Sequence, residues 1–315
     1  MILHRPTSAK SNGISFYLKD RTGIINRVAN SDKSVLLLGE TGTGKDFTAK
    51  KIHELSEKRS KPFVAISCAN IPEELFEAEL FGFARGSFTG AIREKPGLLE
   101  IAKDGTVFLD EIGELSSYLQ AKILRVIEEK EIRRVGETIH RKILARFIFA
   151  TNKELYEEVK RGRFRKDLYF RISVVKFYLP PLRERREEIP FLVNHILERE
   201  NIKQKSKKEI SPVALKKLMS YDFPGNIREL ENIIERACIL SNKSQITDAD
   251  IKLDCGLLGP RASVCLTPEK LRMTLVECHW NKTRAAIEVG KSRRHFYRLL
   301  EKHKLADCIK KKNVL

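Results

Sequence analysis

The order of apolar and polar residues predicts strands that alternate with helices over the first part of the chain. Short apolar runs of strand length lie at 35–38, 62–68, 106–109, 143–150 and 174–179. Stretches with the apolar spacing of an amphipathic helix lie at 23–30, 46–58, 72–80 and 115–129. Strands that alternate with helices predict an α/β fold, in which a parallel sheet is covered on both faces.

The pattern changes after Pro180 and Pro181, where only helical spacing follows. Three helices are predicted at 183–200, 211–220 and 226–240, with a basic break at 203–208. Ser211 and Pro212 are typical of a helix start, as N-cap and first helical residue. We therefore expect five parts: a lead-in 1–20, an α/β subdomain 21–182, a helical subdomain 183–252, a linker 253–266 and a small all-α module 267–315.

The composition excludes several classes of protein. Of 315 residues, 42% are apolar and 32% are charged, which is typical of a globular protein with a sizeable core. No apolar run approaches the roughly 20 residues of a membrane helix, and the N-terminus lacks a hydrophobic signal core, so we expect a cytoplasmic protein without membrane association. The six cysteines lack C-x-x-C spacing and predict reduced packing thiols rather than a metal site.

Positive charge is concentrated towards the C-terminus. Residues 261–315 hold 14 Lys and Arg against 5 Asp and Glu, which is half of the net charge of +18. A small basic module favours an anionic polymer, above all nucleic acid, as its partner. Lys-rich usage for solubility is the alternative that charge alone leaves open.

A glycine-rich segment follows the first predicted strand and opens a helix. It has the spacing G-x-x-x-x-G-K, in which backbone N–H groups and the helix N-terminus cradle phosphate and the lysine neutralises it. We expect ATP to bind here through Gly39, Glu40, Thr41, Gly42, Thr43, Gly44, Lys45 and Asp46. Asp46 stands where Ser or Thr usually supports magnesium, so it either holds the ion through water or only favours the helix start.

Two carboxylates end the third predicted strand. Asp110 is suited to hold Mg²⁺ through water, and Glu111 to orient and polarise the attacking water. Strands often end in acidic residues, so the pair is informative only together with Lys45. The two motifs together predict ATP hydrolysis.

Between these motifs, Phe81 and Gly82 lead into Gly86, Ser87, Phe88, Thr89, Gly90 and Ala91. This segment resembles the GAFTGA signature of the bacterial enhancer-binding proteins, the AAA+ activators of sigma-54 RNA polymerase. Further blocks match in order at 79–82, 110–115, 162–172, 179–186 and 224–230, so the resemblance covers about residues 20–250. It implies an AAA+ P-loop ATPase with a helical lid, which forms a hexameric ring and uses ATP to remodel the sigma-54 polymerase.

The resemblance implies a role for the loop 86–91, which would contact sigma-54 through Phe88 and Thr89 at its tip. Glycines on both sides free the backbone, and an exposed Phe at a loop tip is unfavourable unless it has a partner, which agrees with this role. The alternative is a turn whose Phe folds back onto the core. Ser87 replaces the usual Ala of the signature. Ser67 stands where the family often has an Asn that holds the catalytic glutamate, and its shorter side chain leaves that switch open.

The resemblance also implies residues that sense or stabilise the nucleotide. Asn152 matches the sensor of the γ-phosphate, and Arg228 matches a second sensor on the lid. Arg165 and Arg171 match the arginines offered to the nucleotide of a neighbouring subunit, where such fingers accelerate hydrolysis about 10³–10⁵-fold. Surface salt bridges are the alternative for Arg165 and Arg171, and an ion pair with a glutamate of its own helix is the alternative for Arg228.

The basic module has helix-turn-helix spacing, with helices at 282–289 and 292–303 around Gly290. It resembles the Fis-type helix-turn-helix of most enhancer-binding proteins, with a preceding helix at 267–277 that often helps dimerisation. A basic hairpin that only supports oligomers is the alternative. The predicted contacts to double-stranded DNA are Ser292, Arg293, Arg294, His295, Tyr297, Arg298 and Lys302.

The chain is therefore predicted to be a transcriptional activator that binds upstream DNA and uses ATP to open the sigma-54 polymerase complex. A DNA-binding regulator with ATP only as an assembly ligand, and a general AAA+ remodeller, are the alternatives. Little sequence precedes the ATPase region, so we expect no receiver domain. Control by a separate inhibitory protein, by expression level or by a lost segment then stays open.

Overall fold

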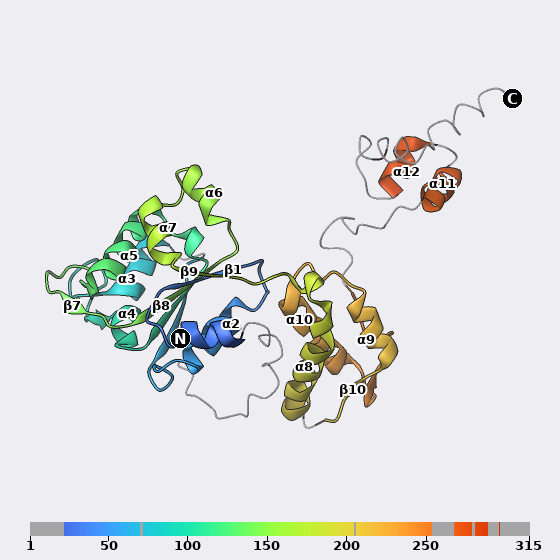
Figure 1. Cartoon of the computed structure of the whole chain (residues 1–315), viewed down its shortest axis with the longest axis horizontal. Helices are drawn as coiled ribbons and strands as arrows, with labels where there is room; N and C mark the ends of the chain where they lie inside the picture. The colour runs from blue at the N-terminus through green and yellow to red at the C-terminus, as the bar shows by residue number, and fades with distance from the viewer. Residues whose placement is uncertain are drawn as a thin grey trace. The chain divides into compact units, whose positions relative to one another are not determined.

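The computed structural model describes residues 22–69, 72–204, 206–253, 268–278, 281–288 and 296 (Figure 1). The chain divides into two compact units, Met1–Ile251 and Lys252–Leu315. The first unit contains an α/β subdomain and a helical lid, and the described residues of the second unit include two helices. We describe each unit by itself.

The α/β subdomain is built on a parallel sheet, as predicted. Four of its strands end in the motifs of the site or next to them, and the fifth, β9, leads into the lid. The strands in spatial order are β2 (Phe63–Ser67), β5 (Thr106–Asp110), β8 (Arg146–Thr151), β1 (Val35–Leu38) and β9 (Val175–Tyr178). Leu38 is opposite Thr151 and Leu109 is opposite Phe149, so the carboxyl ends of the three central strands meet at one edge. Such an edge is where α/β sheets bind ligands.

Helices cover both faces of this sheet, because its central strands are apolar on both sides. One face packs against Ile25 of α1 (Thr22–Ala29) and Ile52 of α2 (Lys45–Glu54). The opposite face packs against a second group of helices, whose positions Figure 1 shows: α3 (Glu73–Phe81), α4 (Leu98–Ala102), α5 (Ser117–Glu129), α6 (Leu155–Lys160) and α7 (Lys166–Ile172).

The predicted elements of this subdomain are present with shifted ends. β1 has its predicted bounds, whereas the helix predicted over 46–58 ends at Glu54 and the strand predicted over 143–150 begins at Arg146. Helices α4, α6 and α7 were not predicted, because helices of only 5 to 7 residues are too short to show a clear apolar period. The same holds for two hairpins, which are β3 (Gly82–Phe83) with β4 (Lys95–Pro96) and β6 (Glu131–Ile132) with β7 (Arg141–Lys142).

The lid corrects one prediction. The helix expected over 183–200 is instead two 3₁₀ turns, Leu182–Glu184 and Arg186–Glu188, followed by α8 (Ile189–Gln204). Arg185 separates the turns with an extended φ of −140°, and its buried guanidinium donates to Thr43 O at 2.8 Å. The first turns of the predicted helix are therefore absent, because the backbone there places Arg185 against the phosphate loop. Periodicity does not reveal such a contact.

The remaining lid helices agree with the sequence. α9 (Pro212–Met219) begins after Ser211, whose hydroxyl accepts from Ala214 N at 3.2 Å, so the predicted cap is confirmed. α10 has its predicted bounds, Asn226–Leu240. The lid is not purely helical, because β10 (Glu209–Ile210) and β11 (Gln245–Ile246) form a short parallel pair.

The second unit contains α11 (Pro268–Glu277) and α12 (Lys282–Glu288). These bounds agree with the helices expected over 267–277 and 282–289. The buried residues of the two helices include Leu271, Leu275, Ala285 and Ala286. All seven predicted DNA contacts lie outside the described residues. No helix in the described part of the chain is long and apolar enough to cross a membrane.

Candidate active site

The phosphate loop connects β1 to α2 and begins at the ligand edge of the sheet. Gly42 and Gly44 have φ angles of 79° and 95°, which favour glycine, and Gly44 is the N-cap of α2. Lys45 is the first residue of that helix and is 5% exposed. Its ammonium donates to Gly39 O at 3.0 Å and to Glu40 O at 3.2 Å, so the lysine is held across its own loop.

The two carboxylates predicted to follow β5 lie beside this lysine. Glu111 Oε1 is 3.8 Å from Lys45 Nζ, and the half-buried Asp110 accepts from Glu111 N at 2.9 Å. Burial raises the pKa of Asp110, and the negative charges of Asp46 and Glu111 raise it further. Asp46 lies in the first turn of α2 with its side chain exposed. The charges of Asp46 and Glu111 therefore act on Asp110, and the Lys45 ammonium lies beside Glu111.

Asn152 joins the phosphate loop to Glu111. It follows β8, and its backbone N–H donates to Glu111 Oε2 at 3.1 Å. Its side-chain amide donates to Thr41 Oγ1 at 3.2 Å. The predicted γ-phosphate sensor thus touches both the loop and the predicted catalytic carboxylate. Ser67 pairs with Asp110 in the strand register and ends β2 at the same edge.

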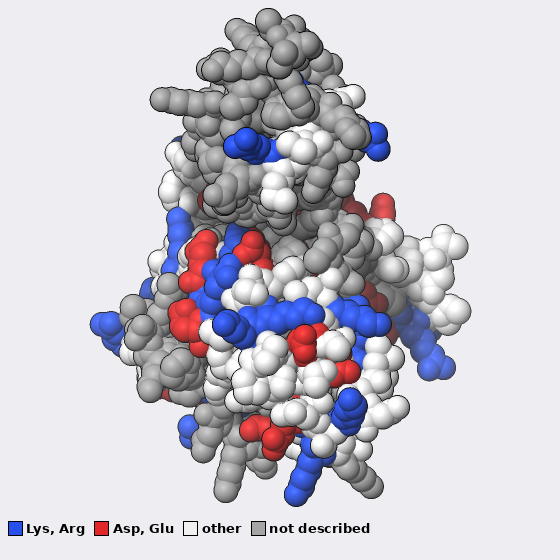
Figure 2. Space-filling view, turned by 90° about the vertical axis from the view of Figure 1, so that its right-hand side faces the viewer, with Lys and Arg blue, Asp and Glu red and all other residues white. Residues whose placement is uncertain are grey.

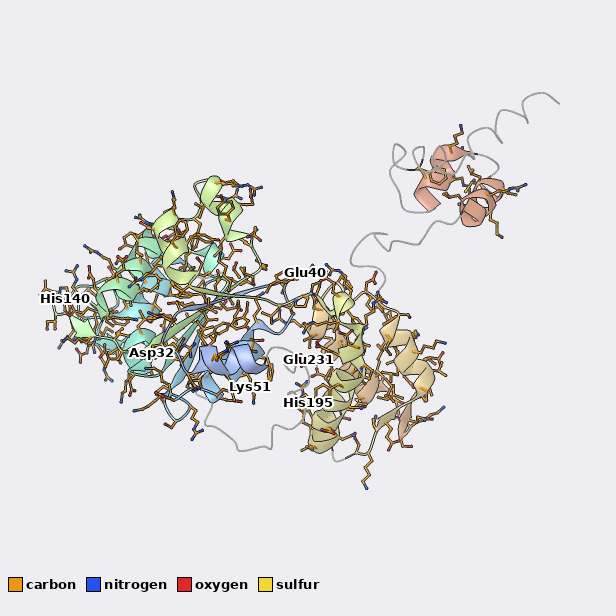
Figure 3. The ribbon with its side chains drawn as sticks, in the orientation of Figure 1. Asp32, Glu40, Lys51, His140, His195 and Glu231 are labelled. Atoms are coloured by element: carbon orange, nitrogen blue, oxygen red, sulfur yellow. The ribbon has the colours of Figure 1, made fainter. Side chains whose placement is uncertain are left out.

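The lid holds the phosphate loop from the other side. Glu40, labelled in Figure 3, receives two hydrogen bonds from Arg183, at 2.6 and 2.8 Å. These bonds lower the pKa of Glu40. Asn226 is fully buried, donates to Glu40 Oε2 and Thr41 O at 3.2 and 3.0 Å, and accepts from Leu182 N at 2.8 Å. The Glu40 side chain therefore faces the lid, while its backbone carbonyl binds Lys45.

The second predicted sensor, Arg228, lies in the first turn of α10 with its side chain exposed. A Cβ at Gly42 would lie 3.2 Å from Arg228 Cβ and would overlap Gly225 O, so α10 begins directly against the phosphate loop. The glutamates that could pair with Arg228 in its own helix, Glu231 and Glu235, are both hydrogen-bonded by Arg199 instead.

The predicted finger arginines lie away from these contacts, on the surface around α7. Arg165 precedes α7 and pairs with Asp167 at 2.7 Å, and Arg171 is exposed in its last turn. Arg163, two residues earlier, is bound through both its Nε and Nη2 by Glu158, at 2.6 Å each. Arg165 thus has the salt bridge considered from the sequence, but its side chain is still 45% exposed.

The loop 86–91 projects from the β3–β4 hairpin. Gly86 and Gly90 have φ angles of 79° and 100°, and Gly86 N donates to Ala91 O at 2.8 Å, which closes the loop. Thr89 is exposed and Phe88 is 47% exposed. The Phe88 ring meets Phe83 edge-on at a centroid distance of 5.0 Å. Phe88 is therefore neither free in solvent nor folded into the core.

The loop rests on the β6–β7 hairpin. Phe83 forms a parallel bridge with Val135, and Ala84 N donates to Val135 O at 2.9 Å. A Cβ at Gly136 would lie 2.6 Å from Ser87 Cβ, so the two loops are in close contact. The Ser87 hydroxyl is buried there with no hydrogen-bond partner in the described residues. Ala at this position would leave no polar atom unpaired.

Charge on the described surface is mixed. On the face shown in Figure 2, Lys and Arg side chains form a band, with Asp and Glu side chains on both sides of it. Three of the six cysteines lie in the described residues, and Cys68, Cys238 and Cys278 are buried free thiols, as expected. No cluster of potential metal ligands, as three or more His, Cys, Asp or Glu, occurs in that part of the chain.

This fold and site define an AAA+ P-loop ATPase domain with a helical lid. Residues 13–178 match the Sigma-54 interaction domain family and residues 183–257 match the AAA+ ATPase lid domain. The chain therefore belongs to the sigma-54-dependent transcriptional activator family.

Relatives with curated descriptions agree with this family. The chain is 42% identical over 287 residues to the transcriptional regulatory protein GlrR of Escherichia coli K12, covering 88% of this chain and 64% of that protein. It is 46% identical over 237 residues to the Nif-specific regulatory protein of Herbaspirillum seropedicae, covering 75% and 44%. The chain thus spans about half of the length of these relatives.

The chain is also similar to a solved structure. The crystal structure of NtrX from Brucella abortus in complex with ADP has a TM-score of 0.71 and 29% sequence identity, covering 96% of this chain and 70% of that one. NtrX was also crystallised with ATP, and that structure has a TM-score of 0.70 and 31% identity.

The sequence analysis did not identify four polar residues that hold the phosphate loop or the loop around Arg165 in place. Three of them are buried, and the fourth, Arg183, is exposed and bonds to the Glu40 carboxylate. Nothing in their spacing marks them. The signal that could have found Asn226 is its place after Gly225, since an Asn in a tight turn tolerates a positive φ, here 55°. The residues missed are Gln120, Arg183, Arg185 and Asn226.

Proposed function

We propose that the chain is an ATP-driven activator of the sigma-54 RNA polymerase, which binds upstream DNA and converts the closed promoter complex into the open one. Family membership supports the partner. The observation that carries the proposal is that one subdomain combines the Lys45, Glu111 and Asn152 cluster with an exposed loop bearing Phe88 and Thr89. A chain that used ATP only for assembly would need neither Glu111 nor this loop.

In the proposed reaction, ATP binds with its phosphates on the loop 39–46. Lys45 would leave its carbonyl partners to neutralise the terminal phosphates. Glu111 would act as the base and orient the attacking water. Asn152, which lies between Thr41 and Glu111, would bind the γ-phosphate. The Asn152 contacts at 3.1 and 3.2 Å support this role, because they lie between the loop and the carboxylate.

Mg²⁺ prefers carboxylate oxygen and water ligands and is usually held by only one or two carboxylates, so it needs no larger cluster of protein ligands. Asp110 is the proposed ligand through water, and Asp46 lies close enough for its charge to raise the pKa of Asp110. The ion, when bound, neutralises charge on the β- and γ-phosphates. The residues of this chain bind and orient the substrate around it.

The proposed active form is a homo-oligomeric ring. Arg165 and Arg171 are exposed at α7, away from the Lys45 cluster of their own subunit, which suits residues that serve the nucleotide of a neighbour. Arg228 would act from the lid on the nucleotide that is bound in its own subunit. The seven basic and polar residues of 292–302 would contact the upstream DNA site.

Co-migration with sigma-54 tests this proposal. The full chain, with and without an ATP transition-state analogue, is run with sigma-54 on a native gel, beside the variant Thr89→Ala. We expect a complex only with the analogue, and none with Thr89→Ala, because the loop tip is the proposed contact. The ATPase rate of Thr89→Ala should stay within about twofold of wild type, since surface substitutions rarely disturb the fold.

Each other outcome has a definite meaning. A complex that Thr89→Ala still forms as well as wild type would sink the loop assignment. Measurable ATP turnover without any complex would favour the alternative of an AAA+ remodeller that acts on another target. DNA binding without turnover would favour the regulator that uses ATP only for assembly.

A further inference from the structure

A buried amide joins the segment after the catalytic carboxylates to the loop that carries Arg165. Gln120 lies in α5 with no exposed surface. Its Nε2 donates to Leu115 O at 2.8 Å and to Arg163 O at 3.0 Å. Its Oε1 accepts from Arg165 N at 2.8 Å. One side chain therefore serves three backbone groups from two segments that lie far apart in the sequence.

Leu115 is linked directly to the catalytic carboxylates. A 3₁₀ turn, Ile112–Glu114, connects Glu111 to Leu115, and it is closed by Glu114 N donating to Glu111 O at 2.9 Å. Glu111 itself has a φ of 53°, so its backbone conformation is tightly specified. A shift of the Glu111 backbone must therefore be absorbed by the short turn that follows it. The carbonyl oxygen of Leu115, at the end of this turn, is the atom that Gln120 contacts.

The loop 163–165, which Gln120 also contacts, is held by several further interactions. Phe164 is buried between the two arginines, and Glu158 holds the Arg163 side chain. Arg165 is the N-cap of α7, so its N–H has no acceptor within that helix. Gln120 supplies this acceptor, and it thereby fixes the backbone from which the Arg165 side chain projects.

We propose that Gln120 is a positioning residue, which holds Arg165 in the geometry needed to serve the nucleotide of a neighbouring copy of this chain. Through Leu115 it also ties that geometry to the catalytic segment of its own subunit. The inference rests on the proposed function, in which Arg165 acts between subunits. An apolar side chain of similar length would leave the three backbone groups unpaired and let the loop shift, and displacements of about 1 Å can cost about 10²-fold in rate.

The first test compares Gln120→Met with Arg125→Met in the full chain. Arg125 lies on the same helix, is 68% exposed and pairs with Glu129, so it is the matched control. We expect kcat for ATP to fall about 10²-fold in Gln120→Met, with KM and the affinity for a fluorescent ATP analogue within about twofold of wild type. Arg125→Met should behave as wild type. Equal kcat in the two variants would overturn the proposal.

The second test separates positioning between subunits from damage within one subunit. Gln120→Met is mixed in equal amounts with Glu111→Gln, which lacks the base but keeps an intact Arg165 loop. A Gln120→Met subunit whose neighbour is Glu111→Gln then receives a well-placed arginine. Turnover of the mixture should exceed that of either variant alone roughly tenfold, because the about 10²-fold loss is restored at those sites.

A reference mixture distinguishes failure of this inference from failure of the proposed function. Arg165→Ala mixed with Glu111→Gln should recover in the same way if Arg165 acts between subunits. Recovery in the reference mixture but not with Gln120→Met would overturn the role of Gln120 alone. No recovery in the reference mixture would refute the shared site, and with it both proposals.

Gln120→Glu keeps the experiment decisive if Gln120→Met does not fold. Its carboxylate can still accept from Arg165 N, but it cannot donate to Leu115 O or Arg163 O. We expect a lower kcat with unchanged analogue affinity, and recovery when it is mixed with Glu111→Gln. A Gln120→Glu variant with wild-type kcat would show that the two donated bonds do not position the loop.

Discussion

At the scale of single residues, Glu111 combines a constrained backbone with a directed side chain. Its φ of 53° is uncommon for a residue other than Gly, Asn or Asp. The conformation brings its carboxylate to Lys45 Nζ and to the N–H of Asn152. Strained backbone of this kind persists only where the surrounding contacts hold it in place, and it is concentrated at functional sites.

Glu111→Gln should bind ATP and lose turnover. The amide has the shape of the carboxylate but cannot act as a base, so we expect kcat to fall by about 10²–10⁴-fold. The affinity for a fluorescent ATP analogue should stay within about threefold of wild type, since the phosphate loop is unchanged. Steady-state ATPase assays and analogue titration measure the two quantities. Turnover equal to wild type would refute the assignment of Glu111 as base.

His53 makes stability depend on pH at the opposite end of the sheet. It is buried at the end of α2, and its Nδ1 is 2.9 Å from Thr106 Oγ1. Burial lowers its pKa below the ordinary value of 6.5. As the pH falls through that ordinary value, the unfolded chain binds a proton that the folded chain does not bind. The contribution to stability is therefore present at neutral pH and is lost on acidification.

The free energy of unfolding, measured with urea between about pH 7.5 and pH 5.5, should fall less steeply in His53→Gln than in wild type. The difference in slope is at most about 1.4 kcal/mol per pH unit, the linkage value for one proton. His140→Gln, at an exposed histidine beside Glu131, is the control. Identical slopes in His53→Gln and wild type would contradict the role of His53.

At the scale of elements, the loop 86–91 and the β6–β7 hairpin act as one assembly. Arg134 of the hairpin segment pairs with Glu100 of α4 at 2.8 Å and with Glu94 near β4 at 3.1 Å. Arg134 is only 9% exposed and Glu100 is 29% exposed, so their ion pair is less screened than a surface pair, whereas Glu94 is 68% exposed. The base of the loop is thus fixed, while its tip remains exposed.

Ser87→Ala should stabilise this assembly. The buried Ser87 hydroxyl has no partner in the described residues, and an unsatisfied buried group costs about 1–3 kcal/mol. We expect the free energy of unfolding to rise by about 1 kcal/mol and amide exchange in 84–91 to slow. Thr138→Ala, at an exposed position of the neighbouring hairpin, is the control. A destabilised Ser87→Ala variant would show that the hydroxyl is paired in solution.

Periodicity predicted an element well where buried residues recur at helical spacing along its whole length. α10 has its predicted bounds because it packs along its whole length, with Leu230, Ile234 and Ala237 buried at helical spacing. The start of the lid was predicted wrongly. Its backbone there is set by Arg185 and Asn226, whose bonds to the phosphate loop compensate for the lost helical turns.

At the scale of the whole molecule, the chain separates an ATPase unit from a small basic one. The division after Ile251 suggests that the first unit folds without the second. Residues 261–315 carry half of the net positive charge on about a sixth of the chain, so we expect the attraction for DNA to be concentrated in the second unit.

Deleting 261–315 should therefore abolish binding to the upstream DNA site and keep the ATPase rate per subunit within about threefold at a protein concentration that permits assembly. Electrophoretic mobility shift and ATPase assays on the truncated and full chains measure the two effects. Equal DNA affinity in both chains would locate the DNA contact in the first unit and refute the proposed module.

The sequence by itself determined the α/β class, the parallel sheet and the place of the phosphate loop, because these depend on local periodicity and on glycines at fixed spacing. It also indicated Lys45, Asp110, Glu111 and Asn152, which the fold gathers at one sheet edge. Only the tertiary structure showed the buried amides of Gln120 and Asn226. Most of their partners are backbone groups distant in the chain, and a polar residue carries no local pattern that identifies such partners.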